Sequence, residues 1–265
     1  MASIMRYPRI RYVDGVRDVC YLYSDTAEFG AKGITTRPLL RAAVRSSERR
    51  QMTDELIFYT HPMSRGRIVR WMLEEIGHPY RTELLDFGTT MKAPEYLSLN
   101  PMGKVPAIRH GDTVVTECAA ICAYLADAFP QAGLAPRPGD RLRGAYYRWM
   151  FFAAGPVEAA VTNNALGFVM PEGRERMAGY GSFADVINVL EGAVSRDDYV
   201  VGDSFTAADV YLGSQVGWGL MFGSIENRPA FEQYWERIGM RPAALRAREI
   251  DDALIAQHKQ TSTAG

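Results

Sequence analysis

Apolar residues between positions 55 and 85 follow two spacings in turn. Leu56–Tyr59 is a short continuous apolar run, typical of a buried strand, and turn-forming residues follow it. From Ile68 to Ile76 the apolar residues recur every three or four positions, which predicts a helix that ends at Gly77. A second strand is expected near Tyr80–Leu84. A strand, a helix and a strand within about 30 residues form a right-handed parallel crossover, so the segment predicts a βαβ unit.

The next segment predicts two closely spaced strands. A short helix is expected at Pro94–Leu99. Strands are expected at Pro106–Arg109 and Thr113–Thr116, joined by the turn sequence His110-Gly111-Asp112. A helix is then expected at Glu117–Phe129. The first domain is therefore predicted to be a βαβ unit followed by a ββα unit.

The chain beyond residue 139 has a helical period throughout. Three prolines and two glycines fall between Pro130 and Gly139, which is the composition of a linker between domains. Helices are expected at Asp140–Leu166, about 172–195, 206–221 and 227–256, the last in two pieces broken at Arg241-Pro242. The predicted fold class is thus an α/β domain followed by an all-α domain.

Charge and composition narrow the kind of partner. The chain of 265 residues has 30 basic and 31 acidic side chains, a net charge of -1, so no overall field draws it to nucleic acid or to anionic lipid. The longest uncharged run, Val210–Ile225, has 16 residues and four glycines, which is too short for a bilayer span and predicts a buried helix. We expect a small-molecule partner, with no nucleic acid and no membrane.

The cysteines favour a reducing compartment. There are three, Cys20, Cys118 and Cys122, with no metal-type spacing and no secretory segment at the start of the chain. We therefore expect a cytoplasmic protein with no metal.

Residues 1–51 differ from the rest of the chain. They hold ten basic and five acidic side chains and no sustained apolar period. Met52 follows directly and could itself be the initiator, which would make 1–51 a mis-assigned start and a dispensable extension. An appended regulatory arm and an Arg-rich transit peptide are the alternatives, and the acidic residues weigh against the transit peptide.

Three motifs, in this order and spacing, carry a resemblance to a known family: Asn100–Ile108, Thr116–Ile121 and Gly202–Asp209. Over about residues 54–250 the chain resembles the soluble glutathione transferases, of a bacterial-like, serine-type kind. The resemblance implies a thioredoxin-like domain at 52–130, a linker at 131–139, an all-helical domain at 140–256 and a tail at 257–265. It also implies that glutathione is a co-substrate beside a small electrophile.

Val105-Pro106 is a candidate glutathione-binding element. A proline entering a strand removes one ladder donor, so the pair suits an edge where a ligand backbone pairs with the chain. An ordinary loop proline before a strand is the alternative. The resemblance implies that Pro106 is cis, that Val105 binds the cysteinyl backbone of glutathione, and that Lys104 belongs to the same site.

Glu117 and Cys118 lie where a strand turns into a helix, and free N–H groups there favour an anion. The resemblance implies that Glu117 faces the ammonium of the γ-glutamyl group and that residue 118 faces its carboxylate. The family usually has Ser at 118, so the weaker cysteine donor leaves more of the binding to the backbone N–H. Alternatively, Glu117 complements the helix dipole and Cys118 is a small buried group.

Ser64 and Arg65 are the candidate catalytic residues. Ser64 suits the N-cap of the first helix, and the resemblance implies that its hydroxyl also donates to the glutathione sulfur. A shift of one residue in this loop would bring Arg65 to the sulfur instead, and Tyr59 is a third candidate. Arg65, Arg67 and Arg70 place cations where the helix dipole disfavours them, which indicates a compensating thiolate or carboxylate, unless they are simply solvated.

Two further motifs are assigned structural roles. Thr206 and Asp209 form an S/T-x-x-D capping box. The aromatic residues early in the helix from Asp140 cannot all fit one face, so some should pack inward and others should meet a second subunit or line an electrophile pocket. With the helix at 117–129, they favour a two-fold homodimer, as the resembling family forms. His61 could lie near the site or in solvent.

Two classes of function remain open from sequence. The first is a transferase of detoxification type, which activates the glutathione thiol for conjugation to an electrophile or for glutathione-dependent reduction. The absence of a cysteine at the start of the first helix weighs against a glutaredoxin-like mechanism. The alternative is a non-catalytic interaction module on the same fold.

Overall fold

The computed structural model describes residues 55–168 and 170–263. The extension predicted at 1–51, and Met52 after it, lie outside the described residues.

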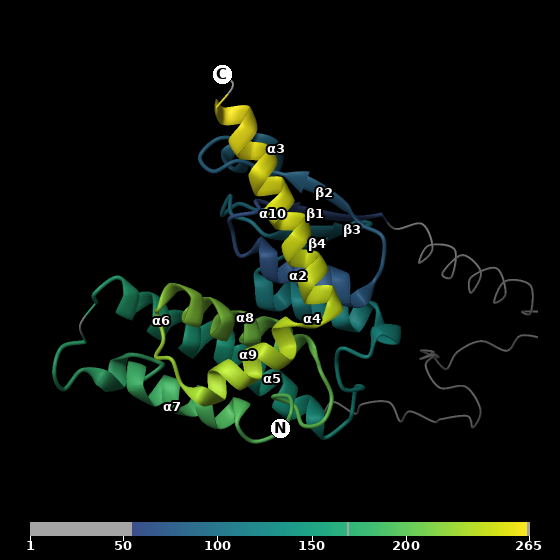
Figure 1. Ribbon diagram of the computed structural model, residues 1–265. Helices are drawn as coiled ribbons and strands as arrows, with labels where there is room; N and C mark the ends of the chain where they lie inside the picture. Colours follow the sequence, from purple (N-terminus) through teal and green to yellow (C-terminus); the bar gives the residue numbers. More distant parts are fainter. Residues whose placement is uncertain (1–54, 169, 264–265) are drawn as a thin grey trace, which may run out of the picture. The chain divides into compact units, whose positions relative to one another are not determined.

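A four-stranded mixed sheet forms the first part of the described chain (Figure 1). Its strands are β1 (Leu56–Thr60), β2 (Arg81–Leu84), β3 (Ala107–His110) and β4 (Thr113–Thr116), in the order β2-β1-β3-β4. β1 and β2 are parallel, whereas β3 is antiparallel to both β1 and β4. This confirms the predicted βαβ and ββα units, because two parallel neighbours need a crossover connection whereas antiparallel neighbours can be joined by a tight turn.

Two helices pack against each other beside this sheet, α2 (Gly66–Ile76) and α4 (Cys118–Ala128). Two short helices, η1 (Thr90–Lys92) and α3 (Pro94–Leu97), follow β2. α2 ends, as predicted, at Gly77, whose φ of 65° is a left-handed conformation that glycine adopts without strain.

The second part of the described chain is helical, as expected. Its elements are η2 (Pro130–Ala132), α5 (Leu142–Phe152), the π-helical η3 (Ala153–Val157), α6 (Glu158–Ala165), η4 (Glu175–Met177), α7 (Phe183–Val194), α8 (Ala207–Phe222), α9 (Pro229–Gly239) and α10 (Pro242–Thr263). The break predicted at Arg241-Pro242 is confirmed, because α9 ends before it and Pro242 begins α10.

The helix expected at Asp140–Leu166 is confirmed as one continuous helical stretch, formed by α5, η3 and α6 over residues 142–165. Its middle is a π-helical segment that contains Pro156, which has no N–H to give to the helical ladder. One expected helix start is wrong. The helix expected from about 172 begins only at Phe183, where the Ser182 side chain accepts a hydrogen bond from the Asp185 N–H. Gly173 and Gly181 have positive φ and terminate any helical period before that point.

α8 is the buried helix that the uncharged run predicted. Its glycines let α9 approach closely: a Cβ at Gly213 would lie 2.1 Å from Ile238, and one at Gly217 would lie 2.6 Å from Trp235. No helix in the described part of the chain is long and apolar enough to cross a membrane.

The capping box at the start of α8 is confirmed and belongs to a larger buried network. Thr206 Oγ1 accepts from the Ala208 N–H at 3.2 Å, and Asp209 Oδ2 accepts from the Thr206 N–H at 2.9 Å. The other oxygen of Asp209 accepts from the Val200 N–H and from the Tyr234 hydroxyl, both at 2.9 Å. Asp209 therefore fixes the loop before α8 and α9 together.

We expect Asp209→Ala to destabilise the protein more than Thr206→Ala. Loss of the cap at Thr206 should lower the free energy of unfolding by about 1–2 kcal/mol. Loss of Asp209 leaves two further buried donors unpaired and should cost about 3 kcal/mol or more. Urea unfolding of both variants measures the difference; equal midpoints would show that the network beyond the cap contributes nothing. Ligand affinity of the folded protein should stay the same in Thr206→Ala.

Candidate functional site

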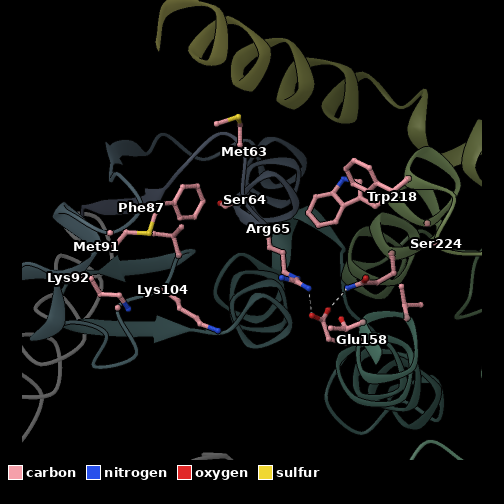
Figure 2. Close-up of a pocket in the computed structure, with 18 residues that line it drawn as sticks. Met63, Ser64, Arg65, Phe87, Met91, Lys92, Lys104, Glu158, Trp218 and Ser224 are labelled. Atoms are coloured by element: carbon pink, nitrogen blue, oxygen red, sulfur yellow. Dashed lines mark hydrogen bonds and ion pairs between the residues drawn. The ribbon is translucent and has the colours of Figure 1, made fainter. Parts of the chain in front are cut away.

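A cavity of about 630 Å³ lies between the sheet part and the helical part (Figure 2). One side is formed by the loops that follow β1 and β2 and by the segment that enters β3. The other side is formed by α6, by α8 and by the turn after α8. The lining residues are Met63, Ser64, Arg65, Phe87, Gly88, Met91, Lys92, Gly103, Lys104, Val105, Glu158, Val161, Thr162, Gln215, Trp218, Gly219, Phe222 and Ser224.

Ser64 reaches this cavity from the loop that leads into α2. Its Oγ accepts a hydrogen bond from the Gly66 N–H at 3.0 Å and donates one to the His61 carbonyl at 2.7 Å. The formal N-cap position is Arg65, but the capping side chain is that of Ser64, as the sequence predicted. The hydroxyl can thus keep its acceptor bond and rotate its proton from His61 toward a ligand atom.

Arg65 lines the cavity but faces the helical part. Its guanidinium forms an ion pair with Oε1 of Glu158, at the start of α6, and the second oxygen of Glu158 accepts from Gln215 Nε2 at 3.2 Å (Figure 2). The compensating anion predicted for the arginines of α2 is therefore a carboxylate of the protein itself.

Val105-Pro106 is a cis peptide bond, as the resemblance implied. Val105 is half-buried and lines the cavity, whereas Pro106 is buried behind it and does not line it. The Lys104 carbonyl accepts from the Tyr96 hydroxyl at 2.6 Å and from Asn100 Nδ2 at 2.8 Å. Burial raises the pKa of Tyr96 to about 12, so this hydroxyl keeps its proton and the segment that enters β3 is fixed.

Cys118 begins α4 and Glu117 is its N-cap residue, and neither lines the cavity. Glu117 is exposed and has a φ of 67°, a conformation that residues other than glycine adopt only where the surroundings impose it. Cys118 is buried, and its thiol donates to the Arg65 carbonyl at 3.5 Å. Burial raises the pKa of this thiol to about 12, so Cys118 is a neutral group packed on the start of α2.

The remaining candidates lie away from the cavity lining. Tyr59 packs on Tyr96, with ring centroids 5.7 Å apart, in a second small core. His61 is buried rather than solvated: its ring lies 4.4 Å from that of Phe87, and its Nδ1 accepts from the Met63 N–H. Among the described residues, no group of three or more His, Cys, Asp or Glu side chains could hold a metal ion.

Sequence reasoning missed most of the cavity wall. Phe87, Glu158 and Trp218 line it from three separate elements, and Figure 2 places the Trp218 indole across the cavity from Phe87. Their positions follow no local motif, because they meet only through the packing of the helical part on the sheet part. The excess of aromatic residues noted in the sequence lies in α5, which contributes nothing to this wall.

The sheet part and the helical part enclose one cavity between them, and comparison with known proteins identifies the family. The family Glutathione S-transferase, N-terminal domain, matches residues 63–128, and the family Glutathione S-transferase, C-terminal domain, matches residues 168–242. Together they match just over half of the chain. The chain belongs to the glutathione S-transferase family.

Similar proteins include plant and bacterial members. Glutathione S-transferase 3 of Zea mays is 27% identical over 201 residues, which cover 71% of this chain and 90% of that protein. The crystal structure of a glutathione transferase from Methylococcus capsulatus has a TM-score of 0.63 at 27% identity and covers 75% of this chain and 99% of its own. A sphingomonad glutathione S-transferase complexed with glutathione has a TM-score of 0.61 at 27% identity, and the match covers 74% of this chain and 98% of that chain.

We expect Cys118 and Cys122 to resist alkylation in the folded protein. Burial raises the pKa of the Cys118 thiol to about 12 and that of Cys122 well above its usual value, so almost no thiolate forms at pH 8. Peptide mass spectrometry after iodoacetamide treatment at pH 8 should find both unmodified, and both alkylated when urea is added. Rapid labelling of Cys118 without urea would contradict its assignment as an inert packed group.

Proposed function

We propose that the protein is a glutathione transferase of the serine type, which activates the glutathione thiol for reaction with a small electrophile. The observation that carries the proposal is the place of Ser64: its hydroxyl lies in the cavity wall, at the N-terminal end of α2, on the same side as the cis Val105-Pro106 segment. Family membership and the glutathione bound to the sphingomonad relative support the same ligand.

Ser64 would act on the thiol as a hydrogen-bond donor. A free thiol has a pKa of about 8.5 and is mostly protonated at neutral pH. A hydroxyl that donates to the sulfur, beside a helix N-terminus, stabilises the thiolate and lowers that pKa. The thiolate then forms a bond to an electrophilic carbon and the leaving group departs with the bonding pair. Alternatively, it attacks a disulfide sulfur and displaces the other sulfur as a thiolate, or it attacks a hydroperoxide oxygen, which breaks the O–O bond and releases the alcohol.

The other predicted residues would hold the peptide. The backbone of Val105, directed by the cis bond to Pro106, would pair with the cysteinyl residue of glutathione. Lys104 offers a nearby cation, and Glu117 a carboxylate for the γ-glutamyl ammonium. Because the Cys118 thiol is already bonded to the Arg65 carbonyl, the γ-glutamyl carboxylate would be held by the backbone N–H of residue 118.

The sulfur chemistry would belong to glutathione, because the two described cysteines are buried with raised pKa values. Such chemistry suits a reducing compartment, which supports the expectation of a cytoplasmic protein. A non-catalytic module on this fold could bind glutathione through Val105 yet would show no turnover with aryl halides, epoxides, hydroperoxides or glutathionyl disulfides. A panel of these substrates distinguishes the two functions.

We also propose a two-fold homodimer, because α5 and the edge strand β4 expose large apolar side chains. Tyr147 and Phe151 of α5 are 44% and 72% exposed, and Val114 of β4 is 39% exposed. Exposed apolar groups of this size favour a partner that covers them.

Ser64→Ala should raise the pKa of the bound glutathione thiol. Loss of a hydrogen bond to a charged sulfur costs about 1.5–3 kcal/mol, or about one to two pKa units. At neutral pH we expect turnover to fall about tenfold or more, with little change in glutathione affinity, since Val105 and Glu117 still hold the peptide. Thiolate absorbance titrated against pH, in both proteins, measures the shift.

The controls separate the hydroxyl from the helix cap and from Arg65. Ser64→Thr keeps a hydroxyl and should keep the thiol pKa close to that of the wild type. Arg65→Ala should change it little, because Glu158 already neutralises this guanidinium. If the thiol titration curve of Ser64→Ala coincides with that of the wild type and the curve of Arg65→Ala is shifted, Arg65 rather than Ser64 is the catalytic residue.

Phe151→Ser should weaken the proposed dimer. Replacing a 72% exposed phenyl group removes apolar area from the interface without a cavity in the core of the protomer. Light scattering should give twice 29.6 kDa for the wild type at micromolar concentration and a lower mean mass for the variant. A wild-type mass of 29.6 kDa would refute the dimer.

A further inference from the structure

α2 and α10 lie side by side and face each other with complementary charges (Figure 1). Along α2 the basic residues come before the acidic ones, and the paired residues of α10 follow the same order. Because the two helices run in opposite directions, the basic end of each helix lies beside the acidic end of the other. The pairs are Arg67 with Asp252 at 2.7 Å, Arg70 with Asp251 at 2.8 Å and Glu74 with Arg246 at 3.3 Å. Arg241, directly before α10, pairs with Glu75 at 2.7 Å.

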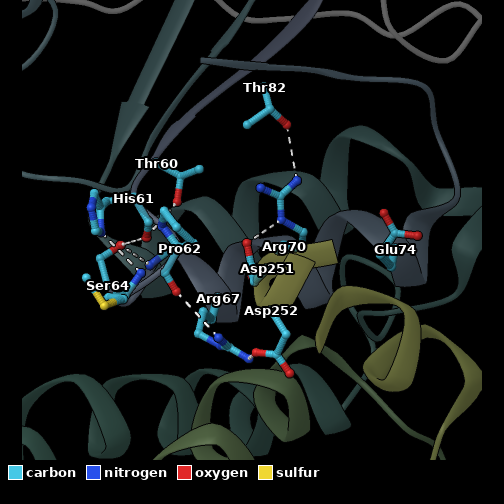
Figure 3. Close-up of polar contacts among 12 residues, drawn as sticks. Thr60, His61, Pro62, Ser64, Arg67, Arg70, Glu74, Thr82, Asp251 and Asp252 are labelled. Atoms are coloured by element: carbon cyan, nitrogen blue, oxygen red, sulfur yellow. Dashed lines mark hydrogen bonds and ion pairs between the residues drawn. The ribbon is translucent and has the colours of Figure 1, made fainter. Parts of the chain in front are cut away.

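The first of these pairs also touches the loop that carries Ser64. Arg67 donates from one terminal nitrogen to Asp252 and from the other to the Pro62 carbonyl, at 3.5 Å (Figure 3). Within the loop, the Ser64 N–H and the Ser64 hydroxyl both donate to the His61 carbonyl. A chain of contacts therefore runs from Asp252 through Arg67 to the backbone next to Ser64.

The two aspartates of α10 differ in burial, and hence in what they do. The side chains of Arg70 and Asp251 are only 2% and 1% exposed, so removing either would leave a buried charge unpaired and would threaten folding. Asp252 is 58% exposed and Arg67 is 24% exposed. A neutral side chain at 252 thus leaves the core intact and loosens only the contact to the loop.

We propose that Asp252, acting through Arg67, is a positioning residue for Ser64. The inference rests on the proposed function, in which the Ser64 hydroxyl donates to the glutathione sulfur. The helical part then holds the loop on the side of α10, through Asp252 and Arg67, while the pair of Arg65 with Glu158 lies on the cavity side. The C-terminal helix has a role in the reaction although it does not line the cavity.

A purely electrostatic role for Asp252 would change the pKa of the bound thiol in the opposite direction. If Asp252 only neutralised Arg67, its loss would leave a more positive helix N-terminus, favour the thiolate and lower the pKa of the bound thiol. If Asp252 positions the loop, its loss lets Ser64 depart from donor geometry and raises that pKa. The sign of the change separates the two roles.

The test compares Asp252→Asn with Arg246→Gln, which removes an ion pair between the same two helices at the far end of α2. Hydrogen exchange of the 61–66 segment, measured without ligand, should be about two- to fivefold faster in Asp252→Asn, the size expected from one partly exposed ion pair. It should be unchanged in Arg246→Gln. With glutathione bound, Asp252→Asn should raise the thiol pKa and lower kcat by a similar factor, with KM for glutathione nearly constant, and Asp252→Glu should restore both.

Three results would overturn the proposal: unchanged exchange at 61–66 in Asp252→Asn, a lowered thiol pKa in that variant, or equal effects from Arg246→Gln. The exchange measurement needs no glutathione. A wild-type protein that fails to bind or turn over glutathione would therefore refute the proposed function, while loop exchange would still decide whether Asp252 holds the loop.

Discussion

The placement of three arginines at the N-cap and in the first turns of α2 is the constraint on which the site depends. Cations at a helix N-terminus are disfavoured by the helix dipole, and each of these three is offset by a carboxylate from the helical part. Glu158 forms an ion pair with Arg65, Asp252 with Arg67 and Asp251 with Arg70. These three ion pairs therefore join the Ser64 loop and the start of α2 to the helical part.

Sequence alone predicted the elements that local rules govern. The strands β1 to β4, the end of α2 at Gly77 and the capping box of Thr206 depend on spacing, on glycine conformation and on short-range hydrogen bonds. The site residues Ser64, Lys104 and Val105 were placed by motif, and the structure brings them to one cavity. The roles of these residues toward a ligand stay predictions.

What the sequence could not predict arises from contacts between distant segments. Glu158 meets Arg65 across 93 positions of the chain, and Asp251 meets Arg70 across 181. Neither carboxylate belongs to a recognisable motif. The irregular stretch before α7 was missed for a different reason: apolar residues continue there at helical spacing, while Gly173 and Gly181 adopt conformations that no helix contains.

The approach of α2 to β1 limits how this site can be altered. A Cβ at Gly66 would lie 1.9 Å from Thr60 Oγ1, so the start of the helix abuts the end of the strand and the loop between them has a fixed span. A larger residue at 66 would push the two elements apart. The chemistry of the site can therefore change through the side chains at 63, 64 and 65, whereas position 66 is restricted to glycine.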